Sequence, residues 1–176
     1  MIRAYRGVAP RIAPTALVTP VADVLGDVLL GAGAACWPGT VLRGDVHFIR
    51  VGAGSQLLAG TVGHVTGGRY PLEIGAGVVA GPAAVLHACV LQDRVTVGAG
   101  AVLLDGAVVE VGAAVVPGAV VTPGTRVPPH VLAAGVPARV LRPLTAEERE
   151  RLAAAAAAWR EYAARFRETA RPVPIA

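Results

Sequence analysis

The chain contains no lysine and few aromatic side chains. All 16 basic residues are arginine, against 12 acidic residues, and aromatic residues make up only 4% of the 176 positions. The arginines are scattered and few aromatic residues lie between them, which argues against a nucleic-acid-binding surface. Globular cores normally use large rings. Since the hydrophobic content is nevertheless 54%, we expect a thin core of valine, leucine and alanine.

Long apolar runs and paired cysteines are also missing. No apolar run is long enough to span a bilayer, and the first residues, MIRAYRGVAPRIAP, contain no signal-peptide core. Two cysteines, Cys36 and Cys89, do not make a disulfide framework. We therefore expect a cytoplasmic protein without a membrane partner, and the length fits a single domain.

What the chain does contain is a repeat of six residues. From Leu91 it reads LQDRVT, VGAGAV, LLDGAV, VEVGAA, VVPGAV and VTPGTR, and Val127 follows. The first position is always leucine or valine, and the fifth is always valine, alanine or threonine. This period fits neither a helix, with its period of 3.6, nor a flat strand, with its period of 2. A repeat of this length is typical of a parallel β-helix, with the first position facing inward.

The same repeat begins earlier in the chain, with two interruptions. Blocks open near Val18 and again at positions 24, 30, 36 and 42, which places Cys36 at an inward position where a thiol acts as a small apolar group. The register slips after Leu42, and the segment VTGGRYPLE predicts a loop projecting from the wall. Three blocks make one coil of about 18 residues, so each block belongs to one of three faces.

This assignment stacks two histidines. The blocks that open at positions 42, 63 and 86 share a face, and their second residues are Arg43, His64 and His87. Neighbouring strands lie about 4.8 Å apart, so His64 and His87 should lie one above the other with Arg43 beneath. Stacked imidazoles at this distance can share a metal ion. A surface pair without a ligand is the alternative.

The end of the chain predicts a helix. Thr145 and Glu148 form a capping box, so a helix should run from about Ala146 to Thr169 and be ended by Pro172. One stripe of this helix is apolar: Leu152, Ala156, Trp159, Ala163 and Phe166. We expect the helix to dock along the outside of the coil. The expected division is residues 1–140 for the β-helix and 141–176 for the helix and tail, as parts of one domain.

Several motifs together resemble the γ-class carbonic anhydrases and their relatives. They are Trp37-Pro-Gly39, Arg43-Gly-Asp45, His64-Val-Thr66, Leu86-His-Ala-Cys89, Leu103-Leu-Asp-Gly106, the Gly135-Val-Pro-Ala138 exit and the terminal helix, and they cover nearly the whole chain. The resemblance implies an all-β fold, a left-handed parallel β-helix of hexapeptide repeats with a C-terminal α-helix on its outside. It also implies a homotrimer with a metal site at each subunit boundary, where three histidines hold zinc, or sometimes iron or cobalt. Metal-bound hydroxide then attacks carbon dioxide to give bicarbonate.

The chain departs from this pattern on one side of the site. By position, the first metal-binding histidine is His64 and the third is His87, but the second slot holds Pro82, which has no donor atom. Polar positions of the family, a glutamine and an aspartate, are occupied by Leu58 and Ala59, and Ala133 replaces a tyrosine near the exit. In the family these positions face Arg43, Asp45, His64 and His87 across the subunit boundary. The resemblance therefore implies a degenerate metal site with one half kept and the facing half apolar.

Three functions remain open from the sequence. The first is a trimeric γ-carbonic-anhydrase-like protein whose carbon dioxide hydration is weak or lost, a possible pseudoenzyme. The second is an active enzyme with a rearranged metal site that recruits His47 or a bound anion, although His47 also fits an ordinary polar residue at the register slip. The third is an acyltransferase that uses a coenzyme A thioester, since this chemistry also occurs on hexapeptide coils. His130, in the proline-rich exit, is expected at the surface.

Overall fold

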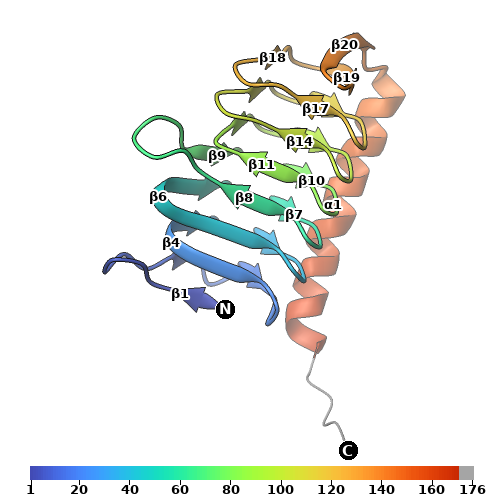
Figure 1. Cartoon of the computed structure of the whole chain (residues 1–176). Coiled ribbons are helices and arrows are strands. Elements are labelled where there is room, and N and C mark those ends of the chain that lie inside the picture. Colours follow the sequence, from blue (N-terminus) through green and yellow to red (C-terminus); the bar gives the residue numbers. More distant parts are fainter. Residues whose placement is uncertain (171–176) are drawn as a thin grey trace, which may run out of the picture.

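In a computed structural model that describes residues 1–170, the chain winds into a stack of coils with one helix along its side (Figure 1). The coils are made of short parallel strands, and their left-handed path is that of hexapeptide-repeat proteins. This confirms the predicted fold class. No helix in this part of the chain is both long enough and apolar enough to cross a membrane.

The strands form three faces. The first and second faces share one sheet, because two long strands, β4 (Asp23–Leu30) and β6 (Val41–Val51), bend from one face to the other. The first face continues with β8 (Val62–His64), β11 (Val85–His87), β14 (Val102–Leu103) and β17 (Val120–Val121). The second face continues with β9 (Leu72–Ile74), β12 (Val90–Leu91), β15 (Val108–Val109) and β18 (Arg126–Val127).

The third face is a separate sheet. Its parallel strands are β3 (Leu17–Val18), β5 (Ala35–Cys36), β7 (Gln56–Leu57), β10 (Val79–Ala80), β13 (Thr96–Val97), β16 (Ala114–Val115) and β19 (Val131–Gly135). It ends with β20 (Ala138–Pro143), which pairs antiparallel with β19. At the opposite end of the stack, β1 (Ile2–Arg3) and β2 (Arg11–Ile12) pair with β4 and form its edge.

The predicted inward positions fill the interior. Leu42, Leu86 and Leu103 on the first face are fully buried, as is Cys36 on the third. Gly63 takes the inward position between the first two, where an added Cβ would lie 2.6 Å from a methyl carbon of Leu42. The core is therefore one side chain deep, which explains why aromatic rings are almost absent from it.

The segment after β8 leaves the coil as predicted. Thr66 and Tyr70 form an isolated antiparallel bridge that closes a short loop, and this loop projects from the stack between β8 and β9 (Figure 1). The ring of Tyr70 lies against Gly106 of a neighbouring coil. The loop is thus tied back to the wall beside the residue that precedes Gly106, which is Asp105.

The terminal helix, α1 (Ala146–Thr169), runs back along the third face (Figure 1). Both hydrogen bonds of the predicted capping box are present between Thr145 and Glu148. The helix ends at Thr169, and the proline predicted to end it, Pro172, lies outside the described residues. The predicted stripe faces the coil: Ala156 and Ala163 are buried, and Trp159 and Phe166 pack against Trp37.

Candidate functional site

Six polar side chains form one hydrogen-bonded row at the first corner, where the first and second faces meet. In order, the row is Arg43, Asp45, His64, His87, Asp105 and Thr66. The structure therefore brings together the four site residues predicted from the sequence. It adds two more, Asp105 and Thr66.

Strand alternation places the two histidines. In β8 the inward residue is Gly63 and in β11 it is Leu86, so the next residue on each strand points outward. The strands are in register, His64 opposite His87 and Arg43 opposite His64. The predicted stack of two imidazoles above an arginine is confirmed.

The ring nitrogens of the histidines face each other and two carboxylates. Nδ1 of His64 lies 3.1 Å from Nε2 of His87. The other nitrogen of His64, Nε2, lies 3.1 Å from Oδ1 of Asp45, and Nδ1 of His87 lies 2.6 Å from Oδ1 of Asp105. Each imidazole is therefore oriented by its own carboxylate, while the remaining nitrogens converge.

The carboxylates are fixed in turn by the two ends of the row. Arg43 Nη1 donates to Asp45 Oδ2 at 3.0 Å, and the Thr66 hydroxyl donates to Asp105 Oδ2 at 2.6 Å. Burial opposes ionisation of Asp45, but the bond from His64 and the Arg43 charge outweigh it and lower the pKa of Asp45. The pKa of Asp105 is lowered chiefly by the Thr66 hydrogen bond, against partial burial and with help from His87. Both side chains are anionic at neutral pH.

The pKa of His64 is lowered from its ordinary value. Burial is the largest cause, and the nearby Arg43 charge adds to it, while the hydrogen bond to Asp45 opposes both. Only 20% of the His64 side chain is exposed. His64 is consequently neutral at pH 7, which leaves one ring nitrogen with a free lone pair.

This arrangement leaves two lone pairs directed at each other when both rings are neutral. A carboxylate only accepts hydrogen bonds, so Asp45 holds the proton of His64 on Nε2 and Asp105 holds the proton of His87 on Nδ1. The converging nitrogens then carry no hydrogen. Two lone pairs at 3.1 Å repel unless a cation lies between them. Either a proton shared by the two rings or a metal ion meets this need.

The pair fits one half of a metal centre. Zinc binds imidazole nitrogen at about 2.0–2.1 Å with tetrahedral angles, so two ligating nitrogens lie about 3.3 Å apart. The observed 3.1 Å between the two rings is close to this separation. Metal-binding histidines also normally donate their other N–H to a carboxylate, as His64 and His87 do here. His64 Nδ1 and His87 Nε2 are thus the atoms that would hold a metal.

The described residues of the same chain supply no third ligand. Within residues 1–170, no group of three or more histidine, cysteine, aspartate or glutamate side chains is placed so that it could hold a metal ion. His47 Nδ1 accepts a hydrogen bond from the backbone N–H of Phe48 at 2.8 Å, and no contact joins His47 to His64 or His87 in the described structure.

Three of the four altered positions, Leu58, Ala59 and Pro82, lie toward the opposite edge of the first face, whereas Ala133 is buried in β19. Ala59 and Pro82 are exposed at the third corner, where the third face meets the first, and the N–H of Ala83 bonds to the carbonyl of Ala59. Leu58 is 7% exposed and belongs to the apolar cluster beneath α1. Within one chain, these positions do not meet the histidine row. They could complete it only from a second copy.

Sequence reasoning assigned no role to Asp105 or Thr66, although both fall in motifs that it singled out. Asp105 lies in the turn after β14, where Gly106 bonds to the carbonyl of Ala88 in the coil below. Ala88 directly follows His87. Counting one coil forward from His87 therefore leads to the Leu-Asp-Gly turn, and this count is the signal that could have found Asp105.

The expectation that His130 lies at the surface needs correction. Its side chain is half-buried, and Nδ1 is buried with no hydrogen-bond partner among the described residues. The ring lies over Gly112, with Nδ1 2.6 Å from the position that an added Cβ would take. The cause is the docking of α1 beside the exit segment, because His130 lines the pocket that the helix forms with the coil.

Several known proteins with similar sequences are named carbonic anhydrases. The chain is 40% identical over 145 residues to the mitochondrial gamma carbonic anhydrase 1 of Arabidopsis thaliana, and the matched region covers 80% of this chain and 53% of that protein. It thus spans about half the length of this relative. It is 38% identical over 148 residues to a carbonic anhydrase of Geobacillus kaustophilus, with 84% of this chain and 81% of that protein covered. No protein-family model matches the chain.

A solved structure has nearly the same fold and a different name. It is a Bacillus cereus protein named as a presumed acetyltransferase, with a TM-score of 0.94 and 31% identity, and the match covers 96% of this chain and 98% of that one. The coiled architecture is therefore shared by proteins with two kinds of named activity.

Proposed function

Because this chain belongs to the γ-carbonic-anhydrase-like family of hexapeptide-repeat proteins, we propose that it is a trimer with half of a metal site and weak or absent carbon dioxide hydration. One observation carries the proposal. The two histidines and the carboxylates that orient them are held in register on one edge of the first face, while the facing edge offers Ala59 and Pro82.

The kept half supports metal binding. His64 Nδ1 and His87 Nε2 would hold the ion, and Asp45 and Asp105 would keep both rings in the ligating tautomer. The family relationship favours zinc, with iron or cobalt as alternatives. A metal bound there would lower the pKa of a water molecule and so supply a nucleophile for carbon dioxide hydration.

The altered half supports loss of turnover. A catalytic zinc normally has three protein ligands and one open position. Pro82 offers no donor, and Leu58 and Ala59 cannot form the hydrogen bonds that would orient a reacting molecule. Two histidines from one chain therefore hold a metal weakly, and carbon dioxide and bicarbonate would find few polar groups on the facing side.

Two measurements on the purified protein test this proposal: its metal content and its rate of carbon dioxide hydration. We expect less than one zinc per three chains after dialysis and little acceleration of carbon dioxide hydration. If the protein instead retains one metal ion per subunit and hydrates carbon dioxide rapidly, the second hypothesis, an active enzyme with a rearranged site, is established. Replacing His47→Ala would then show whether this residue supplies the third ligand, because activity should fall only if it does.

Acyl transfer is the second candidate, and the name of the Bacillus cereus neighbour favours it. His87, held by Asp105 at 2.6 Å, has the orientation of a general base that a carboxylate fixes in one tautomer. Hydrolysis or transfer from acetyl-coenzyme A, measured by thiol release, separates the two proposals. Loss of thiol release in His87→Ala, with no metal dependence, would favour acyl transfer.

A further inference from the structure

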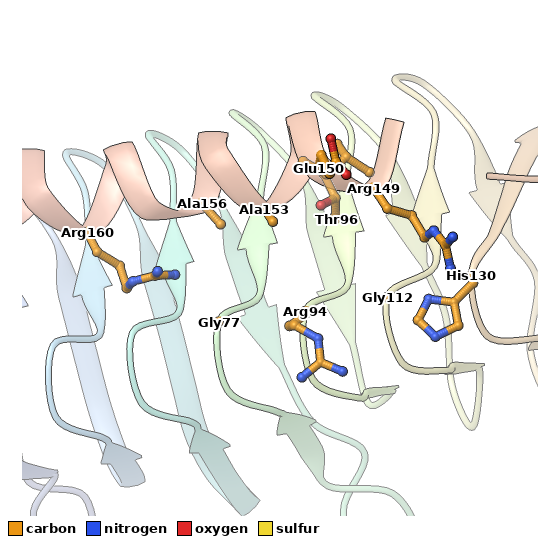
Figure 2. A pocket seen from close by; sticks show the side chains of 11 residues that line it. Gly77, Arg94, Thr96, Gly112, His130, Arg149, Glu150, Ala153, Ala156 and Arg160 are labelled. Atoms are coloured by element: carbon orange, nitrogen blue, oxygen red, sulfur yellow. The ribbon is translucent and has the colours of Figure 1, made fainter. Parts of the chain in front are cut away.

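The pocket lined by His130 lies between α1 and the second corner, where the second and third faces meet. Its volume is about 360 Å³. Arg149 and Arg160 enter it from the helix, and Arg94 and His130 enter it from the coil (Figure 2). The pocket lies on a different corner from the histidine row, so ligand binding here would not depend on the proposed metal site.

The backbone at this corner is left-handed in the successive coils that line the pocket. The stacked corner residues include Gly77, Arg94, Gly112 and His130, with φ values of 65°, 57°, 63° and 56°. The backbone N–H of each of these residues donates to a carbonyl of the preceding coil, as that of Arg94 does to Ala76 at 2.8 Å. Glycine is the residue that takes this conformation without strain. Arg94 and His130 occupy it at a conformational cost, so two basic side chains stand where the fold favours glycine.

The glycines at this corner leave room for the basic side chains. An added Cβ on Gly77 would lie 3.8 Å from Cγ of Arg94, and one on Gly112 would lie 2.6 Å from Nδ1 of His130. On Gly54, in the same column, it would lie 2.7 Å from Cδ of Arg160. Arg94, His130 and Arg160 therefore each lie over a glycine, and an added Cβ at Gly54 or Gly112 would displace Arg160 or His130.

The pocket has excess positive charge. Arg94, Arg149 and Arg160 have no carboxylate partner in the described part of the chain, whereas arginines elsewhere, such as Arg142 and Arg50, are paired. Three guanidinium groups against the single carboxylate of the lining residues, Glu150, leave an excess of two positive charges. Arg149 reaches from the helix toward the ring of His130 (Figure 2). The unpartnered Nδ1 of that ring adds a further polar group.

The charges are spread along the pocket rather than gathered at one point. Gly54, Gly77 and Arg94 lie at the same corner of three successive coils, and coils lie about 4.8 Å apart. Because the Arg160 side chain lies over Gly54, it is about 10 Å along the stack from the backbone of Arg94. Arg94 and His130 are again two coils apart. Between them the helix presents Leu152, Ala153 and Ala156, which form an apolar wall. A single small anion would use only part of this surface.

We propose that this pocket binds a small organic diphosphate of the nucleoside diphosphate class. Guanidinium groups form paired hydrogen bonds with phosphate oxygens, and two or more phosphates would engage Arg94 together with Arg149 or Arg160. The organic part would lie against Ala153 and Ala156. The volume is within the range of small-molecule sites.

Calorimetric titration of the full chain with ADP, pyrophosphate and inorganic phosphate tests the proposal. ADP should bind more tightly than pyrophosphate because of the apolar wall, and pyrophosphate more tightly than phosphate. The key variant is Arg94→Gly, which removes the charge and relieves the left-handed strain. We expect its Kd for ADP to rise at least about tenfold, while its melting temperature stays equal to or above that of the wild type.

Arg6→Gly is the matched control. Arg6 also has a left-handed backbone, with φ of 47°, and is exposed, but it lies outside the pocket. Its replacement removes the same charge and the same strain, and ADP binding should not change. Glu150→Gln should strengthen binding, since it removes the opposing charge. Absence of ADP binding, equal affinity for ADP and phosphate, or equal weakening by Arg94→Gly and Arg6→Gly would each overturn the proposal.

Discussion

His64 and His87 do not use the same ring nitrogen where they face each other. In each ring, the carboxylate on the far side determines which nitrogen faces the other histidine. Asp45 contacts Nε2 of His64, whereas Asp105 contacts Nδ1 of His87. The free nitrogens are therefore Nδ1 in one ring and Nε2 in the other. A single residue behind each imidazole thus determines whether the pair can bind a cation.

Replacing Asp105→Asn tests this dependence. The amide no longer accepts from Nδ1 of His87 as a carboxylate does, so the ligating tautomer is less favoured and zinc affinity should fall about 10- to 100-fold. Competition with a zinc-chelating dye measures this affinity. Asp93→Asn is the control, because Asp93 accepts from the N–H of Ala76 on another corner. Unchanged affinity in Asp105→Asn would show that Asp105 does not orient a metal ligand.

The two cysteines should be inert in the native protein. Burial raises the pKa of Cys36 and of Cys89 to about 12, and both side chains are fully buried. Since the thiolate is the reactive form, neither residue should react with iodoacetamide at mildly alkaline pH before unfolding. Mass spectrometry should show no label on native protein and two labels after denaturation. One label on native protein would contradict this burial.

At the scale of the element, α1 is attached to the coil mainly through Trp37. The Trp37 ring is 5% exposed and lies 5.4 Å from the Trp159 ring and 5.1 Å from the Tyr162 ring. Its indole N–H donates to the buried amide of Gln56 at 3.1 Å. The far end of the helix is held by Arg167, which donates to the carbonyl of Pro14. The helix therefore links the last coil to the first.

Truncation of these rings should destabilise the protein to different extents. Trp37→Ala removes a buried aromatic side chain and the donor to Gln56 Oε1, so the free energy of unfolding should fall by roughly 3–5 kcal/mol. Trp159→Ala should cost less, because Trp159 is only half-buried. Thermal melting of both variants measures the difference. An unchanged melting temperature in Trp159→Ala would mean that the helix does not pack on this face in solution.

The repeat made most of the fold predictable. Because most blocks have six residues and three blocks close a coil, a count that allows for the two interruptions predicts which side chains face inward and which strands are neighbours. This is why the register of His64 with His87 could be predicted. Helix packing was predictable from the apolar stripe that contains Ala156 and Ala163, although not the face on which it docks.

Corner residues were not predictable in the same way. The direction of a side chain there depends on the turn and on what packs over it, and neither can be read from a period of six. Asp105 meets His87 because the Leu-Asp-Gly turn lies directly beside Ala88. His130 is half-buried because α1 forms a pocket with its corner. Both positions depend on how separate elements pack together.

At the scale of the whole molecule, the third corner is an exposed apolar ridge. Successive coils place Pro38, Ala59, Pro82, Ala99 and Pro117 there, and all five are exposed. Backbone bonds connect the coils along it, such as those from Gly60 to Pro38 and from Gly100 to Pro82. The family relationship implies that a second copy of the chain meets this ridge.

We expect a homotrimer in solution, because the histidine row and this ridge are two unlike surfaces that can meet head-to-tail and close a ring. Light scattering coupled to size exclusion should give a mass about three times that of the chain at micromolar concentration. A monomeric mass under these conditions would contradict the trimer, and with it the idea that Pro82 faces the histidines of a second copy.

Replacing Pro82→His tests the half-site directly. If His64 and His87 keep one half of a metal site, an imidazole at this position on the neighbouring subunit completes the minimum set of three protein ligands. Zinc content after dialysis should rise toward one ion per subunit. Hydration should stay slow until Leu58→Gln and Ala59→Asp are added, because a reacting group needs oriented polar partners.

Pro117→His is the matched control for this experiment. It introduces the same side chain at an exposed proline of the same corner, two coils or about 10 Å further along the stack, and removes the same ring constraint. Zinc content should not rise in this variant. Equal zinc content in wild type, Pro82→His and Pro117→His would mean that the two histidines meet only a packed apolar boundary. The row of Asp45, His64, His87 and Asp105 would then be held together by a shared proton rather than by a metal.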